Sequence, residues 1–76
     1  MATVYYPNLM AELARHGIEV SDLSELLGTS RQNVYHKLNK RSAWSLADMT
    51  KIQAYINDNS NGESYTLDYL FTEQIN

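Results

Sequence analysis

The chain has 76 residues and no cysteine, which predicts one small domain and excludes a disulfide framework and a thiolate zinc site. Hydrophobic residues make up 43% of the chain, enough for one core, and no apolar run approaches the roughly 20 residues of a membrane span. The N-terminus lacks the charged and apolar regions of a signal peptide, so we expect a cytoplasmic protein with no membrane partner.

The net charge is −3, but the charges are sorted along the chain. Acids outnumber bases in residues 1–30 and 48–76, whereas residues 31–47 carry cations and no acid. These cations are Arg31, Lys37, Lys40 and Arg41. An acidic total argues against nucleic-acid binding, for which a basic footprint is the usual sign, while the central basic segment is compatible with it.

The N-terminal part predicts an arm followed by a helix. Residues 1–6 are apolar and β-branched or aromatic, and we expect an extended arm there. Pro7 suits the first turn of a helix, where its missing N–H costs nothing, and Gly17 supplies the end. We therefore predict a first helix over 7–16, with one apolar face formed by Leu9, Met10 and Leu13.

Two short helices are predicted next, over 20–27 and 31–39. Gly28 follows the first, where glycine commonly adopts the left-handed conformation, and Ser30 is a favourable N-cap for the second. The apolar positions that would pack the pair together are Leu23, Leu26, Leu27, Val34 and Leu38. Two short helices joined by a tight turn predict a helix-turn-helix.

A fourth helix is expected to begin at Ser45, which has the spacing of a capping box with Asp48. Its apolar stripe comprises Leu46, Met49, Ile52 and Ile56. The polar stretch within residues 57–66 predicts a loop, and Thr66 is a candidate N-cap for a short fifth helix over 67–74. The sequence thus predicts an all-α fold of four to five helices, with Trp44 in its core.

The run from Ile18 to Asn39, with the core D-L-S-E-L-L-G-T-S-R, resembles the helix-turn-helix of phage repressors and Cro proteins. The segment W-S-L-A-D-M-T-K-I that begins at Trp44 is similar to the fourth helix of a small phage-encoded branch of that family. The resemblance covers about residues 7–58. It implies that residues 1–76 form one lambda-repressor-like DNA-binding domain, which regulates transcription in a phage-type genetic switch.

The resemblance also implies how the protein contacts an operator in double-stranded DNA, with the third helix in the major groove. The residues expected at base edges are Arg31, Gln32, Tyr35 and His36. Arginine can donate twice to guanine and glutamine can pair with adenine, and each such contact discriminates by about 1–3 kcal/mol. The residues expected at phosphates are Ser21, Ser30, Asn33, Lys37, Lys40, Arg41 and Ser42.

Two positions depart from the family pattern. Glu19 stands where the family often has a threonine N-cap, and its carboxylate would repel a nearby phosphate. Lys40 stands where glycine is frequent after the third helix. We therefore expect Asn39 to adopt the left-handed conformation that ends this helix.

One helix-turn-helix contacts about half of an operator, so a homodimer is expected, and residues 56–76 are the surface left for it. Leu67, Tyr69, Leu70, Phe71 and Ile75 are the candidate interface residues. Tyr55 and Tyr65, like Tyr69, are either half-buried or part of a subunit interface.

An alternative hypothesis is an acidic modulator, or antirepressor, that keeps the same fold and binds a repressor protein. Charge reversal at Glu12, Glu25 and Asp68 would then remove activity, whereas charge reversal at Arg31 and Lys40 would not. No nucleophile, metalloprotease or phosphate-loop motif is present, so we expect no enzyme and no cofactor. The two histidines have no paired ligand spacing, which predicts no metal site. His16 is expected to interact with the dipole at the end of the first helix.

Overall fold

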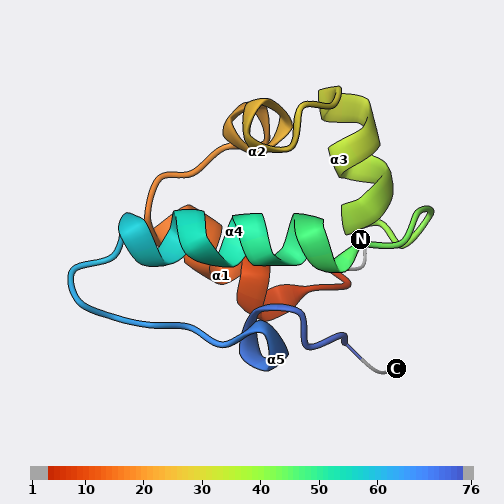
Figure 1. Cartoon of the computed structure of the whole chain (residues 1–76). Coiled ribbons are helices and arrows are strands. Elements are labelled where there is room, and N and C mark those ends of the chain that lie inside the picture. The colour runs from red at the N-terminus through yellow and green to blue at the C-terminus, as the bar shows by residue number, and fades with distance from the viewer. Residues whose placement is uncertain (1–3, 75–76) are drawn as a thin grey trace.

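The computed structural model describes residues 4–74, and within that range the chain forms five α-helices and no strand. The helices are α1 (Pro7–Arg15), α2 (Val20–Leu27), α3 (Arg31–Leu38), α4 (Leu46–Asp58) and α5 (Leu67–Leu70). In Figure 1, α4 crosses the middle of the molecule, with α2 and α3 above it and α5 below it. The predicted all-α class is confirmed.

The turn between α2 and α3 has the backbone geometry that the sequence predicts. Gly28 has φ +67°, in the left-handed region, and the Thr29 amide donates to the Ser24 carbonyl at 3.0 Å. The Ser30 hydroxyl caps α3 by accepting from the Asn33 amide at 3.2 Å. Figure 1 shows α2 nearly end-on while α3 runs within the plane of the view, so the two helices cross steeply. This arrangement is a helix-turn-helix.

The end of α3 differs from the expectation at one residue. Asn39 has φ −98°, whereas Lys40 has φ +61° and is the left-handed residue. The Asn39 side chain donates to the Tyr35 carbonyl at 2.9 Å, which holds Asn39 as the C-cap. The Arg41 amide then donates to the His36 carbonyl at 2.8 Å, a bond that requires the residue before Arg41 to reverse the chain. The prediction of a left-handed Asn39 was therefore wrong.

One apolar core joins all five helices. Its buried residues are Tyr6, Leu9, Leu13, Ile18, Leu23, Val34, Leu38, Ile52, Ile56 and Leu70. Leu46 is 67% exposed and Met10 is 38% exposed, so these two predicted core positions were wrong. Leu46 is the first residue of α4, where its side chain extends past the packed part of the helix.

Helix α4 is longer than predicted and helix α5 is shorter. Helix α4 continues through Asp58, two residues into the predicted loop, and the Asn57 side chain accepts from the Tyr65 amide at 2.8 Å. Helix α5 ends at Leu70 instead of residue 74. Beyond it the Gln74 amide donates to the Tyr5 carbonyl at 2.9 Å, which directs the chain back along the N-terminal segment.

An aromatic cluster joins both ends of the chain to the segment before α4. The ring centroids of Tyr6, Trp44 and Phe71 lie 5.6–6.3 Å apart in edge-to-face pairs. Trp44 is half-buried against the core, and Tyr6 is 6% exposed. Of the predicted N-terminal arm, residues 1–3 lie outside the described residues, whereas Tyr6 belongs to the core.

Candidate nucleic-acid interface

Three of the four residues expected at base edges are exposed on α3. Val34 and Leu38 are buried, whereas Arg31, Gln32 and Tyr35 are exposed, with Tyr35 at 51%. His36 is half-buried. The helical repeat directs Gln32 and Tyr35 away from the two core positions, whereas Arg31, three residues before Val34, is exposed as the first residue of α3.

Helix α1, the start of α2 and the first half of α3 share one surface groove of about 400 Å³. It is lined by Met10, Leu13, Ala14, Ile18, Glu19, Val20, Ser21, Arg31 and Tyr35. Ser21, expected at a phosphate, thus lies on the same side of the molecule as two residues expected at base edges. The groove also contains Glu19, whose amide donates to the Asp22 carboxylate at 2.8 Å as part of the α2 N-cap.

Lys37, which the sequence predicts at a DNA phosphate, is instead paired with an acid and mostly buried. Its ammonium group forms an ion pair with Asp48 at the start of α4 and lies 5.7 Å from the centre of the Trp44 ring. The side chains of Lys37 and Asp48 are only 21% and 18% exposed. The hydrogen bond from Lys37 lowers the pKa of Asp48 despite the opposing effect of burial, so the Asp48 carboxylate stays ionised at neutral pH.

Lys40 is also paired with an acid from outside the basic segment. Its Nζ atom lies 2.9 Å from Glu73 Oε2, and the two side chains are 41% and 48% exposed. The hydrogen bond to Glu73 raises the pKa of Lys40. Within residues 4–74, Arg31 and Arg41 are the cations of the basic segment that form no ion pair.

The remaining predicted phosphate contacts divide into two groups. Arg41 and Ser42 are exposed in the turn after α3. Ser30 and Asn33 are exposed too, but both already make local hydrogen bonds: Ser30 caps α3, and the Asn33 side chain donates to Thr29 Oγ1 at 2.8 Å.

A buried acid that the sequence interpretation placed on the surface anchors α1 to α5. Glu12 is 1% exposed, and its Oε2 atom accepts from the Tyr69 hydroxyl at 2.7 Å. Its Oε1 atom lies 3.4 Å from Arg15 and 3.7 Å from His16. Burial raises the pKa of Glu12, but these partners outweigh it, and the pKa lies below its ordinary value. The helical spacing of residue 12 from the buried Leu9 was a signal for this position.

The predicted dimer surface is largely used within the chain. Leu70 is fully buried, Phe71 packs in the aromatic cluster, and the Tyr69 ring stacks on Tyr65 at 5.7 Å. Ile75 lies outside the described residues. The exposed large apolar side chains elsewhere include Val4, Met10 and Tyr35.

Comparisons with family models, curated proteins and solved structures found no match to this chain. In the described range, no helix has the length and apolarity needed to cross a membrane. The same range contains no group of three or more His, Cys, Asp and Glu side chains placed to hold a metal ion.

Proposed function

We propose that this protein is a sequence-specific DNA-binding transcriptional regulator in which α3 enters the major groove of double-stranded DNA. The observation that supports the proposal is the surface groove between α1, α2 and α3, whose lining includes Ser21, Arg31 and Tyr35. A major groove about 12 Å wide admits one α-helix, and α2 then lies across the phosphate backbone. The resemblance to phage repressors and Cro proteins supports a role in a phage-type genetic switch.

The exposed side chains supply the chemistry for direct contacts with bases. Arg31 is a bidentate donor for guanine O6 and N7, and Gln32 both donates to and accepts from adenine. Tyr35 offers an apolar ring edge to a thymine methyl group. Arg41 and Ser42, beyond the end of α3, are positioned to contact phosphates, which orient the protein without contributing sequence preference.

The test is binding to a mixed pool of regulatory DNA fragments from the source genome, titrated upward from about 50 mM salt, where phosphate contacts are strong. Wild type is compared with Arg31→Ala/Gln32→Ala. The control is Lys51→Ala/Asn61→Ala, which also removes one cation and one amide, at exposed positions outside α3.

We expect wild type to select one fragment and the α3 variant to lose about 30-fold or more, since two bidentate contacts are removed. The control should keep fragment selection. Absence of wild-type binding at low salt, or an equal loss in the control, refutes the proposal.

A second candidate function is a modulator that binds a repressor protein, and the ion pairs of the basic segment favour it. Asp48 and Glu73 offset two cations of the basic segment, which weakens attraction to DNA. Glu25 and Asp68 are exposed and remain candidates for attracting a basic partner, whereas Glu12 is buried and cannot contact one. Under this alternative, a reporter of the switch promoter responds to Glu25→Lys/Asp68→Lys and not to Arg31→Glu.

A further inference from the structure

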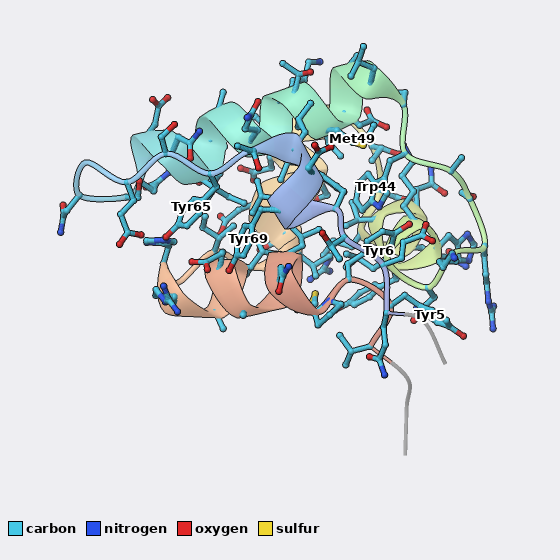
Figure 2. The ribbon with its side chains drawn as sticks, turned by 90° about the horizontal axis from the view of Figure 1, so that it is seen from below. Tyr5, Tyr6, Trp44, Met49, Tyr65 and Tyr69 are labelled. Atoms are coloured by element: carbon cyan, nitrogen blue, oxygen red, sulfur yellow. The ribbon has the colours of Figure 1, made fainter. Side chains whose placement is uncertain are left out.

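Residues 71–74, which we call the C-terminal strap, leave α5 and run past Tyr6 toward Tyr5 (Figure 2). Phe71 fixes the start of the strap, since its ring packs edge-to-face on both Tyr6 and Trp44. The backbone bond from Gln74 to Tyr5 fixes its end. The strap therefore crosses the molecule beside the turn that follows α3.

Glu73 is the strap residue that meets the candidate DNA-binding surface. Its carboxylate lies 2.9 Å from Lys40 Nζ, and Lys40 directly precedes the exposed Arg41 and Ser42. All four residues line one surface pocket together with Tyr6 and Trp44. A carboxylate oxygen thus sits within hydrogen-bond distance of Lys40, where a phosphate oxygen would have to bind.

We propose that the C-terminal strap is an autoinhibitory contact, in which Glu73 occupies the phosphate-binding position at Lys40 and is displaced when DNA binds. The inference rests on the proposed DNA-binding function. Both side chains of the pair are about half exposed, so the contact is exchangeable and water can reach it. The Lys37–Asp48 ion pair, by contrast, is mostly buried. It is therefore less easily opened than the Lys40–Glu73 pair.

Removal of the Glu73 charge should tighten DNA binding. An exposed ion pair contributes little, so Glu73→Gln is expected to raise affinity about two- to five-fold. Because Lys40 contacts a phosphate in the bound state of both proteins, the slope of log K against log[salt] should stay close to that of wild type.

The experiment measures fluorescence anisotropy of a labelled, mixed-sequence DNA duplex across a salt series, with wild type, Glu73→Gln and Asp58→Asn. Asp58→Asn removes the same charge from an exposed residue at the end of α4 that is distant from Asp48 and Lys37. Thermal unfolding of each variant confirms that all three are folded.

Tighter binding by Glu73→Gln, with Asp58→Asn close to wild type, supports the autoinhibitory contact. Wild-type affinity in Glu73→Gln, or an equal gain in both variants, overturns it while the proposed function stands. Absence of DNA binding by all three proteins refutes both.

Discussion

Removal of the Tyr69 hydroxyl tests how α5 is held against α1. Tyr69→Phe removes one oxygen atom, which donates at 2.7 Å to the buried Glu12 carboxylate. The Tyr69 ring is 39% exposed and stays stacked on Tyr65, so little apolar packing changes. The variant therefore isolates one charge-assisted hydrogen bond across the α1–α5 contact.

The expected cost is about 1.5–3 kcal/mol, the contribution of a hydrogen bond to a charged group. Glu12 is 1% exposed, so water cannot replace the lost donor without opening the structure. A chain of this size has a total stability of about 4–11 kcal/mol, so the loss is a large share.

The effect should also depend on pH. The pKa of Glu12 is depressed in the folded protein, so its contribution is present above the unfolded pKa and is lost as pH falls through the folded pKa. The difference between wild type and Tyr69→Phe should therefore shrink when Glu12 becomes protonated.

Urea unfolding followed by circular dichroism, at pH 7 and at about pH 3, measures both quantities. Tyr55→Phe is the matched control, because no described residue hydrogen-bonds to its hydroxyl. A Tyr69→Phe protein as stable as Tyr55→Phe at pH 7, or a difference that grows in acid, would contradict the reasoning.

Two further changes test the packing and the ion pair beside α3. Leu9→Ala should lower the free energy of unfolding in urea by about 2–5 kcal/mol, because Leu9 is fully buried. Leu46→Ala should change it by less than about 0.5 kcal/mol, because Leu46 is 67% exposed. Similar losses in the two variants would contradict the burial of Leu9 and the exposure of Leu46. Asp48→Asn should lower the thermal midpoint at pH 7 and much less at about pH 3, because Lys37 depresses the pKa of Asp48 and this contribution is lost as pH falls. A loss that persists in acid would assign the effect to the α4 cap and not to the charge on Asp48.

The sequence by itself determined most of the secondary structure. The caps at Ser30, Ser45 and Thr66 each accept from an amide three residues ahead, as predicted. Gly28 ends α2 in the left-handed conformation for an equally local reason, the absence of a side chain. Helical spacing also identified most of the core, because burial of one face follows from the period of the helix.

The wrong predictions concern helix ends and residues whose surroundings depend on long-range contacts. Helix α5 ends early where Gln74 bonds to Tyr5, and α4 extends where Asn57 binds the Tyr65 backbone. Leu46 belongs to the correct helical face but lies beyond the neighbouring elements that would bury it.

Only the tertiary structure decided which charges face solvent beside α3. The partners Lys37 and Asp48 are 11 residues apart, and Lys40 and Glu73 are 33 apart. Glu12 and Tyr69 meet across 57 residues. A count of charges along the chain cannot find such pairs, because Coulomb attraction depends on distance in space and on burial. The basic segment is visible in the sequence, whereas its partial neutralisation is a consequence of how α4 and the C-terminal strap pack against it.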